Sequence, residues 1–215
     1  MKRRSAPVRF SGAIRRGRRA GPLKRETLRP GMTVGLFGGS FDPVHAGHLH
    51  VAKVALKQLG LDRIWWIVSP QNPLKNHAPG AYEARLIRVE HIARQPCMVV
   101  SDIEHRTEIP TTADLIRVLK TRHPRVRFVW IMGADNLQQF HRWYRWRDIA
   151  KATAIAVIAR PQNPVRARLS PAARAMAAHR ITEIHSNILA KRDAPGWTYL
   201  TEPLHTEASS RLRDA

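Results

Sequence analysis

The alternation of two kinds of segment constrains the fold of this chain more than any other feature. Apolar runs rich in β-branched and aromatic residues, typical of strands, occur at 33–37, 64–68, 98–101, 127–132, 154–159 and 197–200. Helical spacing or good helix formers mark 47–59, 82–94, 111–121, 170–178 and 207–215, and a short helix is expected after residue 135. This alternation favours βαβ units. We therefore predict an α/β fold with a mostly parallel sheet and helices on both faces, and expect a loop at 161–170.

The most distinctive motifs follow four of these expected strands directly, after 33–37, 64–68, 127–132 and 154–159. Parallel sheets bind ligands outside the carboxyl ends of their strands, at the point where the strand order reverses. The sequence therefore predicts one ligand site, formed by several loops at this edge of the sheet.

The charge of the chain is strongly positive and unevenly distributed. The 215 residues include 37 Lys and Arg against 16 Asp and Glu, a formal net charge of +21. Residues 1–30 contain eleven of the basic residues and a single acid, Glu26. We expect a flexible basic extension there, ahead of a folded domain at 31–215. The excess of positive charge predicts affinity for polyanions, including nonspecific binding by the extension. An organelle transit peptide is the alternative role for the extension.

Composition excludes several other classes of protein. Cys97 is the only cysteine, which excludes an internal disulfide framework and any multi-cysteine zinc site. No stretch approaches the roughly 18 uninterrupted apolar residues of a membrane-spanning helix. We therefore expect a cytoplasmic protein without a membrane partner, and the sequence does not indicate its oligomeric state.

The strongest motif is the eleven-residue block Gly38-Gly39-Ser40-Phe41-Asp42-Pro43-Val44-His45-Ala46-Gly47-His48, between the first expected strand and helix. Adjacent glycines permit unusual backbone angles and close approach of a phosphate to backbone N–H groups. The start of the helix adds orphan N–H groups and a positive dipole end. His45 and His48 share one helix face, where imidazoles can donate hydrogen bonds to phosphate oxygens that gain charge. Asp42 could cap backbone N–H groups or orient a histidine.

From these residues alone, a metal-binding histidine pair or two surface histidines remain alternatives. The block resembles the signature of the nucleotidyltransferase superfamily with an HxGH motif, and its Gly-Gly-Ser-Phe-Asp-Pro-Val-His form is similar to bacterial nicotinate-nucleotide adenylyltransferases. Scattered blocks extend the resemblance over about 33–213. It implies a Rossmann-like fold and adenylyl transfer from ATP to nicotinate mononucleotide, which gives deamido-NAD and pyrophosphate. It also implies Mg²⁺ bound through the ATP phosphates, without dedicated metal ligands from the protein.

The resemblance assigns the residues that would bind ATP. His45 and His48 would be catalytic at the phosphates, beside the backbone of Gly38, Gly39, Ser40 and Phe41. Gly133 would let adenosine approach, Asp135 would accept from ribose, and Arg160 would contact adenine or cap the sheet. Ser209, Ser210 and Arg213 would bind the phosphates, although Ala208 and Arg211 depart from the family pattern. A basic tail without this role is the alternative at the C-terminal end.

The resemblance also assigns the nicotinate-nucleotide side, formed by Asp42, Lys75, Thr112, Ala113, Trp143 and Tyr144. Lys75 would meet a phosphate or lie in solvent. N–H groups at Thr112 and Ala113 would hold the carboxylate, although Thr111 or Thr112 could serve there as a plain N-cap. Trp143 would stack on the ring and the Tyr144 backbone would complete the pocket, with Phe140 and Trp146 in packing. The alternative is that all three aromatics form a core stripe.

Three other functions remain open. An adenylyltransferase for phosphopantetheine would share the loop but has no need of the Trp143 block. One for nicotinamide mononucleotide would not need paired N–H groups for a carboxylate. A basic nucleic-acid-binding protein could retain an inactive nucleotide fold.

Overall fold

The computed structural model describes residues 27–70, 79–159 and 164–201. Its centre is a sheet of seven strands in the order β3-β2-β1-β4-β5-β7-β6, with every pairing parallel. The strands are β1 (Thr33–Gly39), β2 (Arg63–Val68), β3 (Met98–Ser101), β4 (Arg127–Gly133), β5 (Ala154–Ile158), β6 (Arg180–Ile181) and β7 (Trp197–Leu200). The order reverses between β1 and β4, so this Rossmann-like arrangement confirms the predicted fold class.

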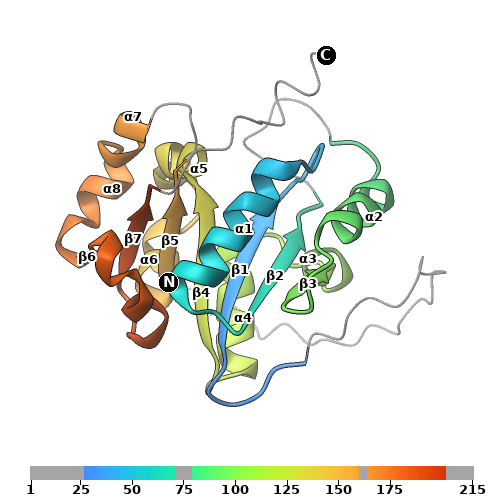
Figure 1. The fold of residues 1–215 in the computed structure, drawn as a ribbon, viewed down its shortest axis with the longest axis horizontal. Coiled ribbons are helices and arrows are strands. Elements are labelled where there is room, and N and C mark those ends of the chain that lie inside the picture. The colour runs from blue at the N-terminus through green and yellow to red at the C-terminus, as the bar shows by residue number, and fades with distance from the viewer. Residues whose placement is uncertain (1–26, 71–78, 160–163, 202–215) are drawn as a thin grey trace, which may run out of the picture.

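Helices cover both faces of the sheet (Figure 1). One face packs against α1 (Ala46–Leu59), α2 (Tyr82–Ile92) and the 3-10 segment η3 (Glu183–Lys191). The other packs against α3 (Ile103–Arg106), α4 (Thr112–Arg122), α5 (Ala134–Gln139), α6 (Trp146–Ala152), α7 (Pro164–Arg168) and α8 (Pro171–Ala175). Because the central strands are buried from both sides, they read in the sequence as continuous apolar runs rather than as alternating ones.

Most expected elements lie within one or two residues of their predicted bounds, whereas α3, α6, β6 and η3 were not predicted. The expected loop at 161–170 contains α7, so that part of the prediction is wrong. Pro164 opens the helix, and proline suits the first helical position because its φ is already helical and no N–H is needed there. The expected helix at 170–178 ends early and continues as the 3-10 turn η2 (Ala177–His179). The basic extension up to residue 26 and the helix expected from 207 lie outside the described residues.

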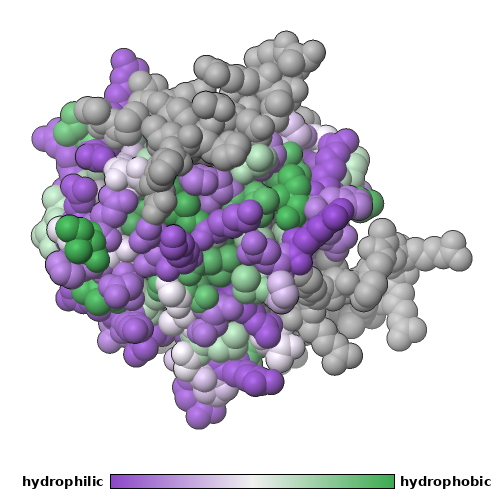
Figure 2. All heavy atoms as spheres, in the orientation of Figure 1, coloured by the Kyte–Doolittle hydropathy of each residue, from purple (hydrophilic) through white to green (hydrophobic). Residues whose placement is uncertain are grey.

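The described surface shows no large apolar face. Figure 2 shows hydrophilic side chains spread over the side that carries α1, with hydrophobic ones between them. Of the exposed large apolar side chains, Ile87, Tyr144 and Leu169 lie on separate segments, and Ile184 and Ile188 both lie on η3. No helix among the described residues is long and apolar enough to cross a membrane.

Candidate functional site

The motif block 38–48 lies where the sequence places it, at the carboxyl end of β1 beside the reversal of strand order. The ends of β2, β3 and β4 reach the same edge: Ser69 and Glu104 follow β2 and β3, and Gly133 ends β4 on the other side of β1. Parallel pairing therefore brings motifs far apart in the sequence to one edge, as predicted.

The two glycines of the block serve packing rather than backbone freedom. Neither Gly38 nor Gly39 has a positive φ, so the expectation of unusual backbone angles is wrong. A Cβ on Gly38 would lie 2.6 Å from Cη2 of Trp130, and one on Gly39 would lie 3.2 Å from the ring of Phe41. The first contact is too close for any Cβ, and the second is tight enough that the Phe41 ring would have to shift by a few tenths of an ångström, so glycine lets β1 pass these two rings.

Phe41 adopts the unusual conformation instead, with φ +46° in the left-handed region. Its buried ring packs against Phe37, Trp66 and His48, with centroids 5.1–5.4 Å apart. The ring is therefore part of the core and does not face a ligand. The Phe41 backbone N–H has no hydrogen-bond acceptor within the described part of the chain.

His45 and His48 form a capping box at the start of α1. The Gly47 N–H donates to His45 Nδ1 at 3.1 Å, and the His45 N–H donates to His48 Nδ1 at 3.3 Å. The rings are buried, with centroids 4.0 Å apart. Since Nδ1 accepts a proton donor in each ring, the neutral imidazole carries its own proton on Nε2.

This capping changes the predicted chemistry of the helix start. The imidazoles occupy the N–H groups of His45 and Gly47, and the His48 N–H donates to the His45 carbonyl at 3.0 Å. The expectation that these groups are orphans is therefore wrong. The ring Nε2–H groups become the donors that this end of α1 can present to an anion.

Asp42 caps a backbone N–H group, which is one of the two roles predicted for it. Its Oδ2 accepts from the Gly80 N–H at 3.1 Å, which joins the motif block to the start of α2. Gly80 is 38 residues further along the chain, so a local turn does not account for the contact.

Arg85 of α2, which sequence reasoning missed, is the most heavily bonded side chain of this edge. It is only 1% exposed. The guanidinium donates to the carbonyls of Ser40 at 2.7 Å, Ser69 at 2.8 Å, Pro70 at 3.0 Å and Gly80 at 2.9 Å. Burial lowers its pKa, and the nearby charge of Asp42 opposes this most.

A positional signal for Arg85 was present in the sequence. Arg85 lies three residues after Tyr82 and four before Val89, and this spacing places it on the apolar face of its helix. Its burial requires carbonyl acceptors from other loops, which no local pattern reveals.

Glu104 extends this buried network to the end of β3. Burial raises its pKa to about 7, and a hydrogen bond with the Ser69 side chain partly opposes the shift. The Ser69 N–H also donates to the Gly39 carbonyl at 2.9 Å. Nearby, Tyr82 stacks on His105 and donates to the Val68 carbonyl at 3.3 Å. Ser69 thus links a buried carboxyl to the motif block.

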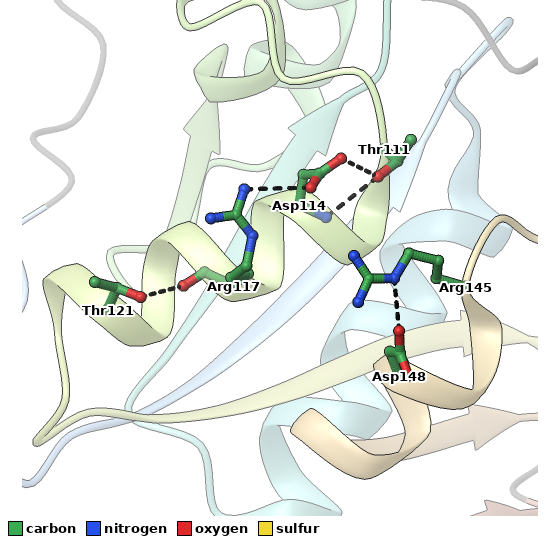
Figure 3. A network of polar contacts seen from close by, with 6 residues as sticks. All are labelled: Thr111, Asp114, Arg117, Thr121, Arg145 and Asp148. Carbon is green, nitrogen blue, oxygen red and sulfur yellow. Dashed lines mark hydrogen bonds and ion pairs between the residues drawn. The ribbon is translucent and has the colours of Figure 1, made fainter. Parts of the chain in front are cut away.

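A second group of donors lies at the start of α4. Thr111 is the N-cap, as predicted: its hydroxyl accepts from the Asp114 N–H at 3.2 Å and donates to the Asp114 carboxylate at 2.7 Å (Figure 3). Arg117 binds the other oxygen of Asp114 at 3.3 Å. The N–H groups of Thr112 and Ala113 have no acceptor among the described residues. The cap and the anion site are therefore compatible.

The Trp143 segment lies beside α4. Trp143 is half-buried, edge-on to Phe140 at 5.4 Å and to Trp130 at 6.1 Å. The Tyr144 backbone N–H also has no acceptor in the described ranges. Figure 3 shows Arg145 bound to Asp148 next to α4. The hydrogen bond with Asp148 raises the pKa of Arg145, and the charge of Asp114 on α4 acts in the same direction.

Phe140 and Trp146 are buried, as predicted for packing residues. The aromatic stripe is thus part of the core, while Trp143 retains exposed surface. Trp143 can therefore both pack against the core and offer a ring face to a ligand.

The remaining predicted residues divide into two groups. Gly133 ends β4, and Asp135 is exposed in the first turn of α5. Lys75, Arg160, Ser209, Ser210 and Arg213 lie outside the described residues. Within the described ranges, no three His, Cys, Asp or Glu side chains are grouped to hold a metal ion.

Comparison with known proteins gives consistent matches. Residues 36–208 match the family described as Cytidylyltransferase-like. The chain is 49% identical over 187 residues to a probable nicotinate-nucleotide adenylyltransferase of Ruegeria pomeroyi, covering 87% of this chain and 88% of that protein. It is 47% identical over 192 residues to one of Parvibaculum lavamentivorans, covering 89% and 96%.

Solved structures share the fold. The nicotinic acid mononucleotide adenylyltransferase of Plasmodium falciparum complexed with NaAD has a TM-score of 0.64 and 19% identity, covering 84% of this chain and 82% of that one. The same protein complexed with APC has a TM-score of 0.63, covering 85% and 83%.

Proposed function

We propose that this chain, which belongs to the Cytidylyltransferase-like family and within it to the nicotinate-nucleotide adenylyltransferases, transfers the adenylyl group of ATP to nicotinate mononucleotide. The observation that carries the proposal is the presence of two groups of hydrogen-bond donors at one sheet edge. The phosphate end comprises residues 38–48 with Arg85. The pyridine end comprises Thr112, Ala113, Trp143 and Tyr144.

The reaction joins the two nucleotides through one new bond. An oxygen of the nicotinate mononucleotide phosphate attacks the α-phosphorus of ATP. The bond from that phosphorus to the bridging oxygen breaks, and pyrophosphate leaves with the electron pair. The attacking phosphate is already anionic near neutral pH, so no strong general base is required. Catalysis then consists of alignment and stabilisation of charge on the phosphate oxygens.

The phosphate end supplies that stabilisation. The His45 and His48 Nε2–H groups donate to the ATP phosphates, since the Nδ1 atoms are held by the helix cap. The Phe41 N–H adds a backbone donor. Mg²⁺ bound to the ATP phosphates would neutralise part of their negative charge, and within the described ranges no group of three His, Cys, Asp or Glu side chains is placed to hold the ion directly.

The pyridine end selects the acid form of the acceptor. The N–H groups of Thr112 and Ala113 lie at the positive end of α4, which has 11 residues, and the Tyr144 N–H adds a third donor. A carboxylate accepts from all three, whereas the –NH₂ half of an amide is itself a donor. The half-buried face of Trp143 stacks on the ring.

Several further predictions from the sequence are part of the proposal. Asp135 accepts from ribose, Lys75 and Arg160 contact the two nucleotides, and Ser209, Ser210 and Arg213 bind ATP phosphates. Polyanion binding by residues 1–30 and a cytoplasmic location also remain predictions.

Pyrophosphate release by the full chain tests the function. ATP and Mg²⁺ are supplied with nicotinate mononucleotide, nicotinamide mononucleotide or phosphopantetheine. We expect the first acceptor to have the highest kcat/KM, and His48→Ala to abolish most of the release. No release with nicotinate mononucleotide, or full activity of the variant, would reject the proposal.

A further inference from the structure

The Arg85 guanidinium lies where three separate backbone segments meet. Its four hydrogen bonds go to the motif block at Ser40, to the segment after β2 at Ser69 and Pro70, and to Gly80 before α2. Each acceptor is a backbone carbonyl, so the guanidinium fixes the orientation of peptide groups rather than of side chains. Burying such a cation costs free energy that these bonds must offset.

The hydrogen bond from Arg85 to the Ser40 carbonyl is the one that bears on adenylyl transfer. The Ser40 carbonyl and the Phe41 N–H belong to one trans peptide group, so they point in opposite directions. With its carbonyl held on the guanidinium side, this peptide directs the N–H away from Arg85. That N–H has no acceptor within the described ranges.

The conformation at Phe41 needs such support. A left-handed φ costs a residue with a side chain roughly 1–2 kcal/mol. Packing of the buried Phe41 ring fixes the side chain of this residue, and the hydrogen bond from Arg85 to the Ser40 carbonyl fixes the peptide group that precedes it. Without the guanidinium, the peptide is free to turn toward a less strained conformation.

We propose that Arg85 is a positioning residue for adenylyl transfer, which fixes the Ser40–Phe41 peptide so that the Phe41 N–H donates to the phosphates of ATP. This inference rests on the proposed function. It predicts that a change at Arg85 lowers kcat/KM for ATP but leaves the KM for nicotinate mononucleotide nearly unchanged, because the pyridine end lies on other elements. A general loss of stability would not separate the two quantities.

Kinetics of Arg85→Lys test the positioning role. Lysine keeps the positive charge, but its three N–H donors belong to one nitrogen and cannot reproduce four hydrogen bonds made from three nitrogens. We expect kcat/KM for ATP to fall about 10- to 100-fold, as for a weakened oxyanion donor, with the KM for nicotinate mononucleotide within about threefold. The matched control is Arg88→Lys, an exposed arginine on the same helix, which should match the wild type. A folded Arg85→Lys protein with unchanged kcat/KM for ATP would overturn the proposal, as would a rise of tenfold or more in the KM for nicotinate mononucleotide.

A second measurement does not depend on turnover or on a stable variant. The Phe41 amide of the ¹⁵N-labelled full chain is followed by NMR while α,β-methylene-ATP and Mg²⁺ are added. We expect a downfield shift of the Phe41 proton in the wild type, which Arg85→Lys reduces. Absence of any Phe41 shift at saturation would overturn the positioning role, even if no variant folds. A wild type that shows the shift but no turnover with nicotinate mononucleotide would instead reject the proposed function alone.

Discussion

The phosphate end and the pyridine end of the site are built in different ways. At the phosphate end, His45, His48 and Arg85 are at most 8% exposed and are tied to backbone groups of several segments. At the pyridine end, Tyr144 is 65% exposed, and the donors are N–H groups at the start of one helix and in one turn. On the proposed function, we expect the fixed, buried groups to set the rate of transfer and the more open surface to select the acceptor.

Replacing His45 by asparagine should give the largest effect. Asparagine is an excellent N-cap, so it preserves the bond from Gly47 while it removes the Nε2–H donor. We expect kcat to fall about 10²- to 10³-fold with little change in thermal stability.

His45→Ala is the matched comparison, because it should lose the same activity and also about 1 kcal/mol of stability from the missing cap. An active His45→Asn protein would show that the imidazole serves only as a cap. His91→Ala, at an exposed position, controls for the loss of any histidine.

The buried carboxyl of Glu104 should make stability depend on pH. Its pKa is raised from 4.5 to about 7 in the fold, so between these pH values the folded chain keeps a proton that the unfolded chain has released. Stability therefore falls as pH rises through this window, by about 3 kcal/mol in total. Glu104→Gln should match the wild type near pH 4 and exceed its unfolding free energy at pH 8.

Urea unfolding at the two pH values measures this difference. The exposed Glu108→Gln should leave the pH dependence of the wild type intact. Parallel pH profiles for wild type and Glu104→Gln would show that this carboxyl is not buried with its proton.

Gly38→Ala tests how the two ends are connected. The added Cβ would lie 2.6 Å from Trp130, whose ring also contacts Trp143 edge-on. Overpacking should cost about 1–3 kcal/mol of stability and raise the KM for nicotinate mononucleotide through Trp143. Gly196→Ala, where the nearest atom is 3.5 Å away, should be nearly neutral. If both variants unfold at the same temperature, the close packing of Gly38 is refuted.

The smallest effect should come from the pyridine end itself. Trp143→Ala removes the stacking face but none of the phosphate donors, so we expect the KM for nicotinate mononucleotide to rise about tenfold. The KM for ATP should stay within about twofold, and Trp143→Phe should be intermediate. A loss of kcat as large as that of His45→Asn would erase the distinction between the two ends.

The sequence predicted the scaffold better than the contacts. The strands were predictable because burial from both sides leaves continuous apolar runs, and the Thr111 cap because its chemistry is local. The capping role of His45 was not apparent, since imidazole caps are uncommon and the ligand role was the stronger pattern. Arg85 was missed because its acceptors come from segments up to 45 residues away.

The α-phosphate of ATP offers the most direct test of the central claim. The full chain is incubated with [α-³²P]ATP, Mg²⁺ and nicotinate mononucleotide, and the products are separated and identified by mass. Adenylyl transfer predicts that the label appears in deamido-NAD and that the pyrophosphate is unlabelled. Label that remains in ATP, or that appears only in AMP, would contradict the account.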